Sequence, residues 1–129
     1  MADQASVTRG LPVVLVVDDE PVQLEIIRQE LRNLVELDSA TSAAEATKCL
    51  AARHYDVIVC DQMLPGEQGL DFLVRAMEEA PSTRRILMTG YTNVEFISRS
   101  TVIAGLSACL VKPLKPAEVA GAIKAALAP

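Results

Sequence analysis

Five polar residues stand at the ends of four apolar runs in this sequence. They are Asp18 and Asp19 after residues 13–17, Asp61 at the end of residues 57–61, Thr89 after residues 85–88, and Lys112 after residues 108–111. Three carboxylates in one place repel one another unless a cation lies among them, and their oxygen atoms suit Mg²⁺. A carboxylate beside such an ion is a possible nucleophile toward phosphorus, and a lysine and a hydroxyl group would stabilise the transferred group. The residue types therefore indicate transfer of a phosphoryl group onto Asp61, with Mg²⁺ neutralising the charge that develops.

The apolar runs predict the strands of a parallel sheet that brings these residues together. The predicted strands are residues 13–17, 35–37, 57–61, 85–88 and 108–111. The run 57–61 is β-branched and apolar on both alternating faces, which is typical of a strand buried on both sides. In a parallel sheet the carboxyl ends of the strands point the same way, and the loops that leave them form a crevice. We therefore expect the five polar residues at one edge of the sheet.

Five helices are predicted between and after these strands. Their apolar positions are Leu24, Ile27, Leu31 and Leu34 after Pro21, then Ala46 and Leu50 after Thr41, then Leu70, Leu73 and Met77 before Pro81, then Val94 and Ile97 before Gly105, and finally Val119, Ile123 and Leu127 after Pro116. Gly105 is predicted to end its helix in a left-handed conformation. Connections of this length are too long for hairpins. The pattern predicts an α/β fold in which right-handed crossovers cover both faces of the sheet.

Length, charge and composition limit the class of protein. The 129 residues, 50% of them apolar, fit one soluble domain, with residues 1–10 expected to be a disordered tail. No apolar run is long enough to cross a membrane and the first residues lack the order of a secretory signal, so a cytoplasmic location is expected. The net charge of −5 without a basic run disfavours direct binding of nucleic acid. The odd number and wide spacing of the three cysteines favour buried, reduced thiols.

The order and spacing of the polar residues resemble the receiver domain of two-component response regulators. The residues that carry the resemblance are Asp18-Asp19, Asp61, Thr89 and Lys112-Pro113, within a match that spans residues 12–127. The resemblance implies a receiver domain over residues 11–129 with a flavodoxin-like, doubly wound sheet of five parallel strands in the order 2-1-3-4-5 and five helices. It also implies a phosphoacceptor, not an enzyme, that is loaded by a sensor histidine kinase or a phosphotransfer protein.

The resemblance assigns roles to the acidic residues. Asp61 matches the phosphoacceptor, and Asp19 and Asp61 match the side-chain ligands of Mg²⁺ or Mn²⁺. Asp18 matches the acid that acts through metal-bound water. Met63 is expected to offer its backbone carbonyl as a further ligand.

The resemblance also assigns roles at the ends of the last two strands. Lys112 matches the lysine that pairs with a phosphoryl oxygen, and the Lys112–Pro113 bond matches one that is commonly cis in the family. Thr89 matches the switch hydroxyl that is drawn inward on phosphorylation. The face around the fourth helix, the fifth strand and the fifth helix is then expected to change its affinity for a partner.

Three positions depart from the family pattern. Cys109 stands where the family carries an aromatic residue whose rotamer follows the switch hydroxyl. We expect Tyr91 to take over part of that surface signal. In the family, the positions two residues beyond the phosphoacceptor and the switch hydroxyl flank the line of attack on the phosphoryl group, and here both carry bulky residues, Met63 and Tyr91. Slow self-dephosphorylation is therefore predicted.

The residues leave other interpretations open. No output domain is expected within this chain, which would be a stand-alone receiver or the amino-terminal receiver of a longer regulator with an unknown output partner. A degenerate receiver would act as an interaction module without phosphorylation. A haloacid-dehalogenase-like phosphatase also uses an aspartate nucleophile with Mg²⁺, but it needs a second acid where Met63 stands. An FMN-binding flavodoxin would need a phosphate-cradling loop where this chain has acids.

Overall fold

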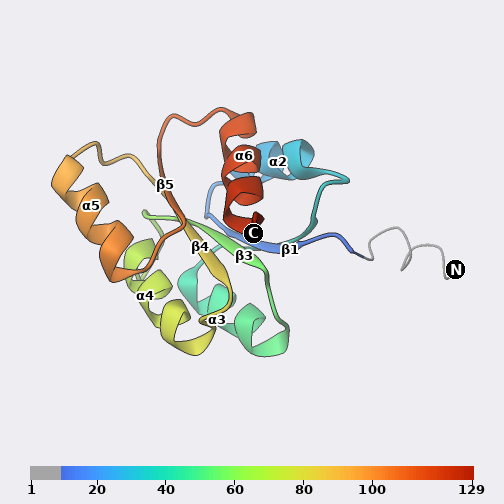
Figure 1. Ribbon diagram of the computed structural model, residues 1–129, viewed down its shortest axis with the longest axis horizontal. Coiled ribbons are helices and arrows are strands. Elements are labelled where there is room, and N and C mark those ends of the chain that lie inside the picture. Colours follow the sequence, from blue (N-terminus) through green and yellow to red (C-terminus); the bar gives the residue numbers. More distant parts are fainter. Residues whose placement is uncertain (1–9) are drawn as a thin grey trace, which may run out of the picture.

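The computed structural model describes residues 10–129, in which strands and helices alternate (Figure 1). The strands are β1 (Val13–Val17), β2 (Glu36–Ala40), β3 (Val57–Asp61), β4 (Arg84–Thr89) and β5 (Ala108–Val111). The helices are α2 (Pro21–Leu31), α3 (Ala43–Ala52), α4 (Gly69–Glu79), α5 (Val94–Ile103) and α6 (Pro116–Leu127). The tail expected at residues 1–10 lies, apart from Gly10, outside the described residues. None of the helices in the described part has the length and apolar character needed to cross a bilayer.

The five strands form one parallel sheet in the order β2-β1-β3-β4-β5. The predicted α/β fold, with flavodoxin-like strand order 2-1-3-4-5 and five helices, is confirmed. The register places Val17 beside Cys60 and Thr89 beside Val111. Because all strands run in the same direction, the residues that follow their carboxyl ends lie along one edge of the sheet.

The helices cover the sheet on both faces, with α2 and α6 on one side and α3, α4 and α5 on the other (Figure 1). The side chains of β1 point alternately into the two layers of the core, one on each face of the sheet. Val14 and Val16 pack in the cluster shared with α2 and α6, whereas Leu15 and Val17 pack in the cluster shared with α3 and α4. Both faces of a strand covered in this way are apolar, which explains the continuous apolar runs in the sequence.

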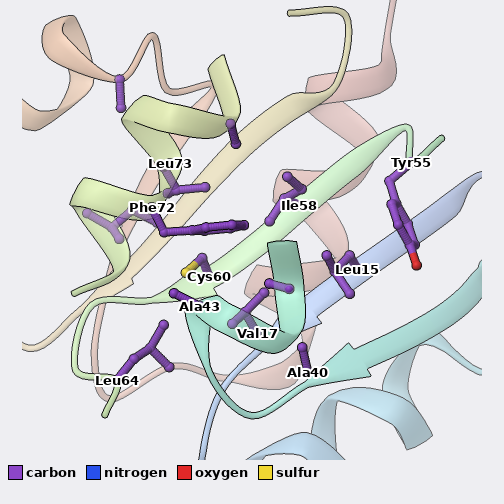
Figure 2. Packing of buried hydrophobic residues seen from close by; sticks show 14 of the residues in the cluster. Leu15, Val17, Ala40, Ala43, Tyr55, Ile58, Cys60, Leu64, Phe72 and Leu73 are labelled. Carbon is purple, nitrogen blue, oxygen red and sulfur yellow. The ribbon is translucent and has the colours of Figure 1, made fainter. Parts of the chain in front are cut away.

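The α4 side of the core is built around β3. Figure 2 shows Phe72 and Leu73 of α4 reaching toward Ile58 and Cys60 of β3, and all four side chains are fully buried. Fully burying an aliphatic or aromatic side chain of this kind contributes about 1.5–3 kcal/mol. The packing of α4 therefore fixes the helix that follows the Asp61 loop.

Two sequence predictions about helices are wrong. The helical spacing extended through Leu34, but α2 ends at Leu31 because Asn33 adopts a left-handed backbone conformation (φ 67°), and the Leu34 side chain is exposed. Val94 was expected to line the inner face of its helix, yet it is 75% exposed. The left-handed conformation predicted for Gly105 at the end of α5 is confirmed by its φ of 56°.

Candidate functional site

Three carboxylates converge at the carboxyl edge of β1 and β3. Each of Asp18, Asp19 and Asp61 offers a carboxylate oxygen, and these oxygens lie within 4.8 Å of one another. Asp18 and Asp61 are buried, whereas Asp19 is exposed. β1 and β3 are direct neighbours in the sheet, and this adjacency is what brings the acids together.

Asp18 is the acid whose surroundings test whether the site fits a cation. Its Oδ1 accepts the backbone N–H of Glu20 (3.0 Å), but its buried Oδ2 has no hydrogen-bond partner. Burial raises the pKa of Asp18, the Glu20 N–H opposes this, and the nearby Asp61 charge adds to it. A buried carboxylate oxygen without a donor is unfavourable unless a cation or its bound water satisfies it. The residues therefore fit a hard, oxygen-preferring divalent cation.

Lys112 places its ammonium group against the acidic cluster. Its Nζ lies 2.9 Å from Asp61 Oδ1. The lysine follows β5, where its backbone N–H donates to Thr89 O (2.7 Å), and the Lys112–Pro113 bond is cis. Pro113 itself is exposed. The site thus combines three carboxylates with one ammonium group, at the carboxyl ends of β1, β3 and β5.

Thr89 ends β4 with its side chain fully buried. Its Oγ1 accepts the backbone N–H of Tyr91 (3.0 Å), which leaves the hydroxyl proton free to be donated. The Tyr91 hydroxyl lies 3.7 Å from Met63 Sδ, and its ring packs edge-on against Phe96 with the ring centroids 4.9 Å apart. The two bulky side chains that follow Asp61 and Thr89 are therefore in contact with each other.

Cys109 lies in β5, half-buried against the core cluster that contains α3 and α4. Burial raises the pKa of its thiol. All three cysteines are free, as expected, but only Cys60 is fully buried, whereas Cys49 and Cys109 are half-buried. The expectation that all three are buried is correct for Cys60 alone.

Sequence reasoning did not single out the residues that hold the loop after Asp61. Gln62 is buried, and its side chain bonds to the start of α4. Glu67 receives two hydrogen bonds from Arg75, of 3.0 and 2.6 Å, and this contact lowers the pKa of Glu67. The sequence did contain a signal for Gln62, since it is a polar residue directly after a buried apolar strand. It contained no signal for the pairing of Glu67 with Arg75.

Comparisons with known proteins assign a class to this fold and site. A family model described as the response regulator receiver domain matches residues 14–124. The signal receiver domain of an HD domain-containing protein from Pseudomonas fluorescens Pf-5 has a similar structure (TM-score 0.83, 31% identity, 91% of this chain and 87% of that one). The chemotaxis response regulator CheY4 of Vibrio cholerae shares the fold (TM-score 0.83, 23% identity, 91% and 99%).

Two transcriptional regulatory proteins that are similar to this chain are longer than it is. The hydrogenase transcriptional regulatory protein HoxA of Bradyrhizobium diazoefficiens is 34% identical over 114 residues, which cover 88% of this chain and 24% of the relative. The probable transcriptional regulatory protein TcrX of Mycobacterium tuberculosis is 38% identical over 126 residues, which cover 92% and 51%. The chain thus spans between about a quarter and a half of the length of these relatives.

Fold and site together define a flavodoxin-like α/β domain with an acidic edge and one lysine. The chain belongs to the family of response regulator receiver domains of two-component systems.

Proposed function

We propose that this chain accepts a phosphoryl group on Asp61 and that loading of Asp61 changes the affinity of the domain for a partner protein. One observation carries the proposal. Lys112 Nζ contacts Asp61 Oδ1 at 2.9 Å beside two further acids, one of which has a buried oxygen without a hydrogen-bond partner. Such a cluster is unfavourable on its own and becomes favourable around a divalent cation and a phosphoryl group.

The proposed transfer uses residues of this chain in distinct roles. Because Lys112 holds Oδ1, Oδ2 of Asp61 is the oxygen that attacks phosphorus. As the new O–P bond forms, the bond between phosphorus and the imidazole nitrogen of the phosphohistidine donor breaks, and that nitrogen keeps the electron pair. Lys112 then pairs with a phosphoryl oxygen, and the Thr89 hydroxyl donates a hydrogen bond to another phosphoryl oxygen.

Mg²⁺ or Mn²⁺ is the cofactor in this proposal. Asp18, Asp19, Asp61 and the backbone carbonyl of Met63 would hold it, with Asp18 acting through bound water. When bound, the ion neutralises the negative charge of the phosphoryl group during transfer.

The response begins at Thr89. Movement of its hydroxyl toward the phosphoryl group breaks the 3.0 Å bond from the Tyr91 N–H, and Tyr91 in turn contacts Met63 and Phe96. The partner face is formed by α5, β5 and α6, and it includes Tyr91, Cys109 and Pro113. Val94 and Val102 are exposed on α5, which supports this choice. The contact between Met63 and Tyr91 also supports slow self-dephosphorylation, which stays a prediction.

The proposal includes a setting for the domain. Residues 11–129 would form a receiver that works in the cytoplasm, and a sensor histidine kinase or phosphotransfer protein would load it. Its output would come from a partner protein or from a further domain of a longer regulator, as the names of HoxA and TcrX as transcriptional regulatory proteins suggest. The domain itself would not bind nucleic acid, because its net charge is −5.

Mass spectrometry tests the proposal directly. The purified chain is incubated with acetyl phosphate, or with beryllofluoride, in the presence and absence of Mg²⁺, beside an Asp61→Asn control. We expect metal-dependent addition of one phosphoryl group, or its fluoride mimic, to the wild type and none to the control. No addition, together with no rise in melting temperature with Mg²⁺, would show that the domain is a degenerate receiver that acts without phosphorylation.

A further inference from the structure

Gln62 is a buried polar residue between the proposed phosphoacceptor Asp61 and the expected metal-ligating carbonyl of Met63. Its side chain is 2% exposed, although it follows a strand whose other residues are apolar up to Asp61. Burial of an amide is unfavourable unless its donor and acceptor are both satisfied. The partners of Gln62 therefore indicate what the residue does.

Both ends of the Gln62 amide bond to the start of α4. Oε1 accepts the backbone N–H of Leu70 (2.8 Å), and Nε2 donates to Oε1 of Gln68 (3.0 Å). The backbone carbonyl of Gln62 also accepts the N–H of Gly69 (3.0 Å). The first N–H groups of a helix lack intrahelical partners, and here residue 62 satisfies two of them, while the N-cap residue Gln68 makes no capping bond of its own.

These bonds close the loop of residues 62–69 at its base. Gly69 lies so close to Asp61 that a Cβ built on it would stand 2.1 Å from the Asp61 carbonyl oxygen. On the other side, the Gln62 backbone N–H donates to Met88 O (2.8 Å), one residue before Thr89. Residue 62 thus joins the phosphoacceptor strand, the returning end of the loop and the strand that carries the switch hydroxyl.

We infer that Gln62 is a positioning residue, whose buried amide closes loop 62–69 and thereby fixes the direction of the Met63 carbonyl and of the Asp61 carboxylate toward a divalent cation. This inference rests on the proposed function. Groups that orient metal ligands from outside the coordination shell commonly change metal affinity by 10–100-fold when they are removed. Gln62 orients its neighbours through the backbone, so an effect at the lower end of that range is expected.

The test compares Gln62→Met with Gln68→Ala. Methionine keeps the length of the side chain and removes its donor and acceptor, whereas Gln68→Ala removes only the bond to Gln62 Nε2 and leaves the Leu70 bond intact. Isothermal titration calorimetry of the phosphate-free protein with MgCl₂ measures the dissociation constant. We expect it to be about tenfold larger than that of the wild type for Gln62→Met and nearly unchanged for Gln68→Ala.

Gln62→Glu keeps the inference testable if the methionine variant folds poorly. Its carboxylate still accepts the Leu70 N–H, and the exposed Gln68 amide can turn to donate to it. We therefore expect Mg²⁺ binding at least as tight as that of the wild type.

If the role of Gln62 were purely structural, replacing it would lower the free energy of unfolding without a selective effect on Mg²⁺ binding. Arg75→Met removes another contact that holds the loop, its ion pair with Glu67, and urea unfolding without Mg²⁺ measures the stability of each variant. Weaker Mg²⁺ binding in Gln62→Met than in Arg75→Met, beyond what their measured difference in stability accounts for, supports positioning, and equal binding in these two variants overturns it. If the wild type itself neither binds Mg²⁺ nor accepts a phosphoryl group, the proposed function has failed; if it does both while Gln62→Met matches it, only the role of Gln62 has failed.

Discussion

Two neighbouring segments leave the same edge of the sheet and are held very differently. The loop after β3 is tied down by Gln62 and by the Glu67–Arg75 pair, and α4 buries Phe72 and Leu73 against β3. In the segment after β4, α5 buries Ser100 alone, and its valines face the solvent. The better-held segment follows the proposed phosphoacceptor, and the other follows the proposed switch hydroxyl.

The difference teaches where rigidity is needed. Ligands for a small cation must be held within a few tenths of an ångström, so the segment that carries them benefits from many buried contacts. A segment that must change its position on phosphorylation is expected in the low-stability part of the structure, because a ligand can shift an equilibrium only by its difference in interaction free energy with the two states. Loop 62–69 with α4 and residues 90–103 fit these two roles.

The same glycine-to-alanine change in each segment should give the largest contrast. In Gly69→Ala the new methyl group meets the backbone of Asp61, whereas nothing lies within 4 Å of a Cβ at Gly90. We expect Gly69→Ala to lower the free energy of unfolding by about 3 kcal/mol. Gly90→Ala should change it by less than about 0.5 kcal/mol. Urea unfolding measures both, and equal losses would show that the two segments are held equally.

Among residues 10–129, two buried polar side-chain atoms have no hydrogen-bond partner, and the first is Asp18 Oδ2 at the acidic edge. We expect Asp18→Asn to raise the free energy of unfolding without Mg²⁺ by about 1 kcal/mol at pH 7, because it removes a buried charge. Mg²⁺ should then stabilise the wild type but not the variant.

The sign of the pH dependence follows from the raised pKa of Asp18. Between the ordinary pKa of 3.8 and the raised value, the folded state binds more protons at this carboxyl group than the unfolded state. The contribution of Asp18 to stability therefore improves as pH falls through that window, and the advantage of Asp18→Asn should shrink in acid. A variant that is less stable than the wild type at pH 7 would contradict this account.

The second unpartnered atom is the Ser100 hydroxyl beneath α5. Ser100→Ala is expected to raise the free energy of unfolding by about 1 kcal/mol, because it removes a buried hydroxyl and improves helix propensity. Ser98→Ala on the exposed side of α5 is the matched control and gains from propensity alone, about 0.5 kcal/mol. Identical gains in thermal and urea unfolding would show that burial of the Ser100 hydroxyl is not unfavourable.

The ion pairs of the two segments should give the smallest contrast. Arg75 makes two hydrogen bonds to Glu67 and one to Thr47 (3.2 Å), whereas Arg99 lies 3.8 Å from Glu95 on the exposed side of α5. Arg75→Met is expected to lower the free energy of unfolding by about 0.5 kcal/mol. The loss should be smaller in high salt, because salt screens the ion pair in the wild type. Arg99→Met should leave it unchanged within error, and a larger loss for Arg99→Met would reverse the comparison.

The acidic edge could be predicted from sequence because it depends only on strand ends. Asp61, Thr89 and Lys112 each close an apolar run, and a parallel sheet forces such ends to one side. The strand order came from the family resemblance rather than from the runs themselves.

Other features depend on tertiary placement and could not be predicted. The helical spacing continues to Leu34, yet the left-handed turn at Asn33 stops α2 before it. The bond from Leu70 to Gln62 forms only after the loop between them has folded back. Val94 has the residue type of a core position, but the inner face of α5 is set by its contact with the sheet edge, which leaves Val94 exposed.

The exposed valines of α5 have a consequence for evolution. Val94 is 75% and Val102 80% exposed, so replacing either removes little packing from the core. Sequence change on this face is therefore nearly free of a folding penalty, while change in loop 62–69 is not. A lineage of such domains could acquire new binding partners by drift on α5 and retain its acidic edge unaltered.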